Sequence, residues 1–318
     1  MNIKIFAGDQ NPELAQRIAK HLKIQLGKIE IKKFANGEER AQLCESVNGR
    51  DVFLVQSTTP PAENFVRALQ MIDAAKRGRA HRINMVIPDF GWGRQDRIDR
   101  PRAPITARIQ ASCIESVGAH GVLTMDLHKS QIVGFFSIPV SQIFARTILL
   151  DWLKKSKPKN PVVIVPDEGA AVSARWYAER LGVRRVYVDK ERNSEGHTKV
   201  DEITGTIGEN DTAIIVDDII DTGGTIINTM VSLKEKRGVK KFIVMATHGE
   251  LSGSAIDRLN SSYATTIVIT DTIEQPEEKK KALMSSKSKF KIVSVAGMFA
   301  EAIKRLHTGE GSLSDLAE

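Results

Sequence analysis

One stretch of the sequence combines the residue types that could bind a phosphorylated sugar. The apolar run Ile214–Val216 is followed by carboxylates, hydroxyls and adjacent glycines: Asp217, Asp218, Asp221, Thr222, Gly223, Gly224 and Thr225. Glycines let the backbone approach a ligand closely, so successive N–H groups and the start of a helix can hold a phosphate. Carboxylates beside a phosphate would repel it unless they bind sugar hydroxyls or a metal ion. The stretch therefore predicts a site for a phosphorylated sugar.

The main structural alternative is a turn followed by a capped helix, because Asp, Thr and Gly are common in turns. The paired acids ahead of the turn argue against this interpretation. The stretch is neither a Gly-Lys-Ser/Thr phosphate loop nor a dinucleotide-binding fingerprint. Gly91-Trp92-Gly93 lacks a third glycine at the required spacing.

Short apolar runs alternate with segments of helical period along the whole chain, which predicts an α/β fold with mostly parallel strands. The first helix is expected after Asn11, which can cap it, with Pro12 in its first turn and Leu14, Ile18 and Leu22 on one face. The expected strands are Val52–Val55, Met85–Ile87, Val122–Leu123, Val162–Val165, Ile214–Val216, Phe242–Met245 and Ile267–Ile269. Ligands of open parallel sheets bind at the carboxyl ends of the strands, where these runs stop.

The order of elements is repeated in the two halves of the chain. A strand at Val52–Val55, a polar loop, a helix ending at Lys76-Arg77-Gly78 and a further strand have counterparts after Asp211, where the helix ends at Lys236-Arg237-Gly238. We interpret this as two related domains, residues 1–150 and 151–318, joined near the Lys- and Pro-rich stretch 154–161. The alternative is the general similarity of any two βαβ units.

Composition indicates a globular protein of the cytoplasm. Of the 318 residues, 41% are hydrophobic and 27% charged, and the formal charge is +7. No apolar run approaches the ~20 residues that span a bilayer, no charged leader is expected, and the two cysteines support neither a disulfide framework nor a Cys-based zinc site. Aromatic residues are only 5% of the chain, so small phosphorylated ligands are preferred to nucleic acid as anionic partners.

The chain resembles the ribose-phosphate pyrophosphokinase family, of the phosphate-regulated type, from Lys4 to Ser314. Residues Asp217–Thr225 resemble the phosphoribosyl-pyrophosphate loop of type I phosphoribosyltransferase folds. Further motifs carry the resemblance: residues 34–38, 94–97, 102–106, 124–128, 134–136, 166–167, 189–192, 247–249 and 252–253.

The resemblance implies two tandem α/β domains of type I phosphoribosyltransferase-like fold and a diphosphotransferase activity. ATP and ribose-5-phosphate would give 5-phosphoribosyl 1-diphosphate and AMP, which supply purine, pyrimidine, NAD, histidine and tryptophan synthesis. It also implies Mg²⁺ as cofactor and self-association as a homohexamer, with neither nucleic acid nor membrane as partner.

The resemblance assigns the substrates to separate groups of residues. Ribose-5-phosphate is expected at Asp217 and Asp218 through its hydroxyls, and at Asp221, Thr222, Gly223, Gly224 and Thr225 through its phosphate, with Arg192 nearby. ATP is expected at Phe34, Asn36, Gly37, Glu38, Arg94 and Gln95, with Phe34 stacked on adenine. A guanidinium such as that of Arg94 can bind phosphate oxygens through two hydrogen bonds.

The same resemblance supplies the metal and catalytic residues. His128 and Asp167 are the expected metal ligands, although Mg²⁺ prefers oxygen and a lone His is often structural. Lys190 and Arg192 are the expected transition-state cations, ahead of a polar stretch (193–198) that could close over the site. The alternative for these two is an exposed charged turn.

Regulation by phosphate and ADP is expected at Ser46, Arg102, Ser312 and Ser314. Asn48 stands where such relatives often have Arg, which leaves the expected site one cation short. Asn36, Asp89, Trp92, Glu168 and Leu251 also depart from common family patterns and bear on nucleotide fit and regulation.

Two other functions remain open from the sequence. A nucleobase phosphoribosyltransferase shares the loop 217–225 but needs neither the ATP motifs nor a second domain. A non-catalytic regulatory relative of the synthetase is argued against by intact Lys190, Arg192, His128 and Asp221–Thr225.

Overall fold

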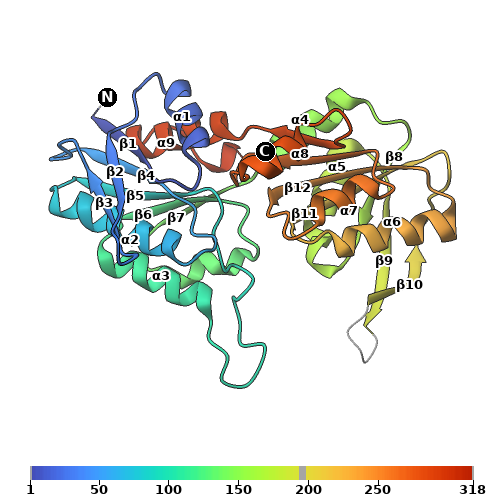
Figure 1. The fold of residues 1–318 in the computed structure, drawn as a ribbon. Coiled ribbons are helices and arrows are strands. Elements are labelled where there is room, and N and C mark those ends of the chain that lie inside the picture. Colours follow the sequence, from blue (N-terminus) through green and yellow to red (C-terminus); the bar gives the residue numbers. More distant parts are fainter. Residues whose placement is uncertain (1, 193–197, 317–318) are drawn as a thin grey trace. The chain divides into compact units, whose positions relative to one another are not determined.

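The computed structural model describes residues 2–192 and 198–316. Two compact units divide the chain: residues 1–145, 272–274 and 294–318 form the first, and residues 146–271 and 275–293 form the second (Figure 1). This division assigns the C-terminal segment to the first unit, whereas the boundary at residue 150 remains a prediction about the domains. No helix in the described ranges is both long enough and apolar enough to cross a membrane.

A five-stranded parallel sheet, in the order β1-β4-β5-β6-β7, forms the centre of the first unit. Its strands are β1 (Ile3–Ala7), β4 (Asp51–Val55), β5 (Arg82–Ile87), β6 (Gly121–Met125) and β7 (Val140–Ile143). The helical elements of the unit are α1 (Pro12–His21), α2 (Glu63–Arg77), α3 (Thr106–Val117), η1 (Ser130–Phe135), α9 (Ala296–Thr308) and η3 (Ser314–Leu316). Strands β2 (Ile29–Lys33) and β3 (Glu39–Leu43) form a separate antiparallel hairpin.

Every residue of β4 and β6 is buried, so these strands are covered on both faces, as expected where helices cover a parallel sheet. Val52 and Leu54 pack with Met71 and Ile72 of α2 in one core cluster.

Helix α9 lies beside α1 although the two are at opposite ends of the sequence (Figure 1). The C-terminal helix, whose location the sequence did not predict, therefore packs within the first unit.

The first helix begins as the sequence predicts. The Asn11 side chain accepts a hydrogen bond from the N–H of Leu14 at 3.1 Å, and Pro12 occupies the first turn. Leu14 and Ile18 are fully buried. The Asn11 cap satisfies a backbone donor that would otherwise lack an intrahelical partner.

A seven-stranded sheet, in the order β10-β9-β8-β11-β12-β13-β14, forms the centre of the second unit. Its strands are β8 (Pro161–Val165), β9 (Arg185–Arg192), β10 (Thr198–Thr204), β11 (Thr212–Ile220), β12 (Lys241–Gly249), β13 (Thr266–Thr270) and β14 (Phe290–Val293). Its helical elements are α4 (Arg146–Ser156), η2 (Glu168–Ala170), α5 (Ala171–Leu181), α6 (Gly224–Arg237), α7 (Ala255–Ser261) and α8 (Glu277–Leu283). All neighbouring strands are parallel except β9 and β10, which are antiparallel.

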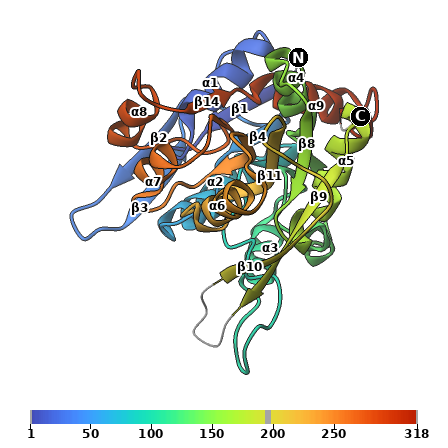
Figure 2. The ribbon, with the colours of Figure 1, turned by 90° about the vertical axis from the view of Figure 1, so that its right-hand side faces the viewer.

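Alternate residues of the central strands face opposite layers of helices. Ala213 and Ile215 of β11 share a core cluster with Met230 and Leu233 of α6. Helix α5 lies beside β8 and β9 (Figure 2). In each unit five adjacent parallel strands therefore form the body of the sheet, β1-β4-β5-β6-β7 and β8-β11-β12-β13-β14, which confirms the predicted α/β class with two parallel sheets.

Candidate active site

The predicted phosphate loop connects β11 to α6 in the second unit. Strand β11 extends to Ile220, so Asp217 and Asp218 lie on the strand rather than after it, because β12 continues to pair with this end. Helix α6 begins at Gly224, and its N-cap residue, Gly223, has no side chain that could cap it. The first N–H groups of a helix lack intrahelical partners, so a helix start of this kind can bind an anion.

Gly223 is required by the geometry of this loop. It has φ +73°, a region that favours glycine, and a Cβ at this position would lie 3.0 Å from Leu259. Gly224 differs, since a Cβ there would meet nothing closer than 3.8 Å. The two glycines thus have separate roles: Gly223 permits the turn, and Gly224 keeps space open above the helix start.

Three carboxylates concentrate negative charge beside this loop. Burial raises the pKa of the Asp217 carboxyl well above its ordinary value, and the charges of Asp218 and Asp167 raise it further. The N–H of Asp218 donates to Asp217 Oδ1 at 2.9 Å, which opposes this rise. Repulsion among these carboxylates favours a ligand that offers hydroxyl donors or a positive charge.

Asp167 lies just beyond the end of β8, which pairs with β11. Its side chain is exposed, and Oδ1 accepts a hydrogen bond from the N–H of Ala170 at 3.1 Å. This bond fixes the carboxylate at the start of η2. The structure therefore brings Asp167 and Asp217 to the same edge of the second sheet, as the sequence predicts from the strand ends.

Lys190 and Arg192 lie on β9 rather than in a loop after it. The strand continues to Arg192 because β10 pairs with it, with Lys190 opposite Val200 and Arg192 opposite Thr198. Their side chains, and residues 193–197 of the polar stretch that could close over the site, lie outside the described part of the chain.

In the first unit, residues 34–38 form the tip of the β2–β3 hairpin. The N–H of Phe34 donates to the carbonyl of Glu38 at 2.8 Å, and that of Glu38 donates to Asn36 Oδ1 at 3.1 Å. Gly37 has φ +91°. The Phe34 ring is 39% exposed, and Lys32 and Arg40 lie 5.7 and 5.9 Å from its centre. An exposed ring with two cations near it suits a base that carries phosphates.

Arg67 positions this hairpin, and sequence reasoning missed it. The side chain is 5% exposed and forms ion pairs with Glu39, the first residue of β3 after the hairpin tip, and with Asp9, after β1. Gln70 on the same helix binds the N–H of Ala41 and the carbonyl of Glu39. The only sequence signal was an Arg on the apolar face of α2, which does not identify a partner.

The predicted residues between β5 and α3 lie close to His128. Arg94 and Gln95 are exposed, and Thr106 Oγ1 donates to Gln95 Oε1 at 2.5 Å. A Cβ at Gly93 would lie 3.7 Å from the Cβ of His128, which follows β6. The structure therefore places the Arg94 loop and His128 side by side in the first unit.

The two expected metal ligands lie in different units. His128 belongs to the first unit and Asp167 to the second. Within the described residues, no group of three or more His, Cys, Asp or Glu side chains is arranged to hold a metal ion. The carboxylates near β11 nevertheless fit Mg²⁺, which is held by one or two carboxylates together with substrate phosphates and water.

The expected regulatory residues all belong to the first unit. Ser46 and Arg102 are exposed, and Arg102 has φ +66°. Ser312 and Ser314 follow α9 with their Oγ atoms 2.5 Å apart, and Arg305 donates to the carbonyl of Ser312. Leu251, which departs from the family pattern, is buried, and its N–H donates to Ile220 at 3.0 Å, below the phosphate loop.

Comparison with known proteins extends over almost the whole chain. Residues 3–118 match the N-terminal domain of ribose phosphate pyrophosphokinase, and residues 197–317 match the phosphoribosyl synthetase-associated domain. A ribose-phosphate pyrophosphokinase of Caldanaerobacter subterraneus subsp. tengcongensis is 44% identical over 310 residues, with 97% of this chain and 96% of the relative covered. One from Haemophilus influenzae is 42% identical over 313 residues, covering 97% of each.

A solved structure agrees with these sequence relationships. The phosphoribosylpyrophosphate synthetase of Mycobacterium smegmatis superposes with a TM-score of 0.89 at 34% identity, covering 98% of this chain and 100% of that one. Both the fold and the order of the motifs are therefore shared along the full length. The chain belongs to the ribose-phosphate pyrophosphokinase family.

Proposed function

We propose that the residues described above carry out the reaction named by this family. The chain is a ribose-phosphate diphosphokinase, which transfers the diphosphate group of ATP to ribose-5-phosphate and forms 5-phosphoribosyl 1-diphosphate and AMP. The observation that supports this most directly is the start of α6 at Gly223 and Gly224, which follows Asp217 and Asp218. It offers donors to a phosphate next to acceptors for sugar hydroxyls.

Ribose-5-phosphate is assigned to the second unit. Its phosphate would accept hydrogen bonds from the N–H groups of residues 222–225 and from the hydroxyls of Thr222 and Thr225. Asp217 and Asp218 would accept hydrogen bonds from the ribose hydroxyls, which offsets the repulsion between the two carboxylates. Asp221 lies at the mouth of the same loop.

ATP is assigned to Phe34, Asn36, Gly37 and Glu38 on the hairpin and to Arg94 and Gln95. The ring of Phe34 would stack on adenine, and the guanidinium of Arg94 would bind phosphate oxygens. In the reaction, the oxygen of the C1 hydroxyl bonds to the β-phosphorus and loses its proton. The bond between that phosphorus and the oxygen bridging to the α-phosphorus breaks, and AMP leaves with the electron pair.

Lys190 and Arg192 are assigned to the charge that develops during this transfer. Phosphoryl transfer depends on alignment and on neutralising negative charge more than on covalent catalysis. Two cations on β9, next to β8 in the sheet, are suited to that role. Arg192 would also contact ribose-5-phosphate.

Mg²⁺ is the proposed cofactor, with Asp167 and His128 as its protein ligands. When bound, it would neutralise phosphate oxygens and help to align ATP. The oxygen donors around Asp167 and Asp217 fit this ion, and ATP oxygens would supply the remaining ligands.

Assembly, regulation and location are also proposals from the family relationship. We propose a homohexamer of the phosphate-regulated type, located in the cytoplasm, with Ser46, Arg102, Ser312 and Ser314 at the regulatory phosphate. Size-exclusion chromatography with light scattering tests the assembly. A monomer at micromolar concentration would contradict it.

Phosphorus NMR of the purified protein with ribose-5-phosphate, ATP and Mg²⁺ tests the reaction. Equal amounts of AMP and 5-phosphoribosyl 1-diphosphate are expected, and AMP formation should require ribose-5-phosphate. ADP in place of AMP would show that a single phosphoryl group, and not the diphosphate, is transferred. Unchanged ATP would instead favour a regulatory relative, and turnover of 5-phosphoribosyl 1-diphosphate with a nucleobase would indicate a phosphoribosyltransferase.

A further inference from the structure

Arg258 lies against the loop at residues 221–225, although it comes 33 positions after Thr225 in the sequence. Its Nη1 donates to the carbonyl of Thr222 at 3.3 Å. Its Nη2 lies 3.8 Å from the position that a Cβ on Gly224 would occupy, and Thr222 Oγ1 lies at the same distance from that point. The guanidinium and the Thr222 hydroxyl therefore flank the open space above Gly224.

The helix that carries Arg258 holds it firmly in this place. Ala255, Ile256 and Leu259 of α7 are buried, while Arg258 itself is exposed. Leu259 also packs under Gly223, where a Cβ would be 3.0 Å from its side chain. One face of α7 thus packs beneath the turn, and Arg258, the residue before Leu259, places a cation beside the turn.

The charge of the loop explains what this cation can do. Residues 217–225 contain three carboxylates and no basic residue. A sugar phosphate bound there has two or nearly two negative charges at neutral pH, so backbone donors alone would have to overcome its repulsion from Asp217, Asp218 and Asp221. A guanidinium presents five N–H donors, and in the described residues the Thr222 carbonyl accepts from one of them. The other donors can serve a phosphate.

We propose that Arg258 is a substrate-binding residue whose guanidinium binds the phosphate of ribose-5-phosphate above Gly224. This inference rests on the proposed assignment of that phosphate to the loop at Thr222–Thr225. The residue acts on binding of the sugar phosphate and not on the transfer of the diphosphate, because it lies at the phosphate end of the substrate.

The test is steady-state kinetics of Arg258→Gln with each substrate varied in turn. Gln retains an N–H donor but loses the charge, so the KM for ribose-5-phosphate should rise about 10-fold or more, as for a lost charge-assisted hydrogen bond. The kcat and the KM for ATP should remain within about twofold. Arg258→Lys should lie between the wild type and Gln, because it restores the charge without the planar fork.

Ionic strength separates a role in charge from a role in holding the turn. The KM for ribose-5-phosphate should rise with KCl in the wild type and rise less in Arg258→Gln, whose site has one cation fewer. If Arg258 only holds the Thr222 carbonyl in place, Arg258→Gln should instead have a lower thermal midpoint, and its KM should rise with KCl as steeply as that of the wild type. That result would overturn the proposal. Arg175→Gln, on the exposed Arg175–Glu179 pair of α5, is the matched control and should change neither KM.

Gly224→Ala distinguishes failure of this inference from failure of the site assignment. Its Cβ fits the protein without a close contact but occupies the space assigned to the phosphate. If Gly224→Ala raises the KM for ribose-5-phosphate and Arg258→Gln does not, the role of Arg258 is wrong and the loop assignment stands. If neither variant changes that KM, the phosphate binds elsewhere and both are wrong.

Discussion

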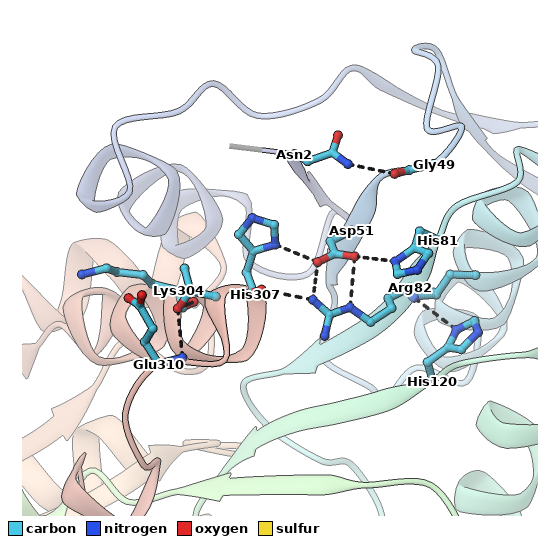
Figure 3. A network of polar contacts seen from close by, with 11 residues as sticks. Asn2, Gly49, Asp51, His81, Arg82, His120, Lys304, His307 and Glu310 are labelled. Atoms are coloured by element: carbon cyan, nitrogen blue, oxygen red, sulfur yellow. Dashed lines mark hydrogen bonds and ion pairs between the residues drawn. The ribbon is translucent and has the colours of Figure 1, made fainter.

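The Nδ1 atom of His307 lies 2.7 Å from Oδ2 of Asp51, which joins the last turns of α9 to the first residue of β4, 256 positions earlier in the chain. Asp51 is buried and also accepts hydrogen bonds from Arg82 and contacts His81 (Figure 3). Arg82 donates in turn to the carbonyl of His307 at 3.2 Å. One carboxylate therefore joins the C-terminal helix to the first residues of β4 and β5.

Asp51→Asn should destabilise the first unit. The substitution leaves the Arg82 guanidinium without its carboxylate, and because that guanidinium is 40% exposed, the loss of the charge-assisted hydrogen bonds should cost about 1.5 kcal/mol. Urea unfolding at pH 7 measures the change. His81→Asn is the matched control, because His81 contacts the same carboxylate from a side chain that is 70% exposed, and its effect should stay below about 0.5 kcal/mol. Equal effects of the two variants would contradict the role of Asp51.

The same network makes stability depend on acid pH. Hydrogen bonds from Arg82, and then from His307 and His81, lower the pKa of Asp51 below its ordinary value of 3.8. The contribution of Asp51 to the free energy of unfolding is therefore complete above pH 3.8 and is lost as the pH falls toward the lowered pKa. Between pH 5 and pH 3, about one unit on either side of the ordinary value, the unfolding free energy of the wild type should fall more steeply than that of Asp51→Asn. Parallel curves would exclude this linkage.

Asp217→Asn should stabilise the protein and lower its activity. The raised pKa of Asp217 means that its ionised form is penalised in the folded chain, a cost that is absent at low pH and grows as the pH rises through that pKa. Removal of the charge should raise the unfolding free energy at pH 8 and raise it less at pH 4. The KM for ribose-5-phosphate should rise about 10-fold because Asn replaces a charged acceptor.

Glu235→Gln is the control for Asp217→Asn. It removes one exposed carboxylate from α6, and it should change neither stability nor the KM for ribose-5-phosphate. If Asp217→Asn were less stable than the wild type at pH 8, the claim that the charge of Asp217 destabilises the folded protein would be wrong.

The turn between β11 and α6 and the parallel sheets could be predicted from the sequence because their signals are local. The apolar run before Asp217 and the glycines after Asp221 lie within a few residues of one another, and Asn11 caps a helix that starts next to it. The extension of β11 to Ile220 was not predictable from composition. It depends on pairing of Ile219 and Ile220 with His248 and Gly249 of β12.

Residues that act through distant partners gave no such signal. Lys190 and Arg192 continue β9 because β10 satisfies their backbone groups, although the sequence there is charged. Arg67 and Arg258 are single basic residues on helices, and only the tertiary structure shows that they contact Glu39 and Thr222. Sequence periodicity places a residue on a face but does not identify what lies opposite it.

Phe34→Ala should weaken ATP binding. Stacking of a base on an aromatic ring contributes about 1–3 kcal/mol, so the KM for ATP should rise about 10-fold while the KM for ribose-5-phosphate stays unchanged. Tyr263→Ala is the matched control, since Tyr263 is also exposed and has Lys234 3.6 Å from its ring centre. A shift in the KM for ribose-5-phosphate instead would place Phe34 at the other substrate.

Lys190→Ala should lower turnover far more than ATP binding. If Lys190 stabilises charge that develops only during transfer, its loss should reduce kcat about 10²- to 10³-fold and change the KM for ATP by less than about threefold. Lys199→Ala, on the neighbouring strand β10, serves as the control and should retain kcat within about twofold. Near-normal kcat in Lys190→Ala would remove Lys190 from the transition state.

Phosphate should activate the enzyme, and the activation should depend on Ser312. The Oγ of Ser312 accepts the N–H of Ser314 at 3.2 Å, and Arg305 holds the Ser312 carbonyl, so the tail after α9 presents two hydroxyls together. In a non-phosphate buffer, added phosphate should raise the initial rate, and Ser312→Ala should require about 5- to 10-fold more phosphate for half-maximal activation, as expected for one lost hydrogen bond. Asn48→Arg should require less phosphate, because it adds the cation that this chain lacks at the expected site. A flat rate across the titration, in the wild type and in Asn48→Arg alike, would contradict phosphate regulation while leaving the transfer reaction intact.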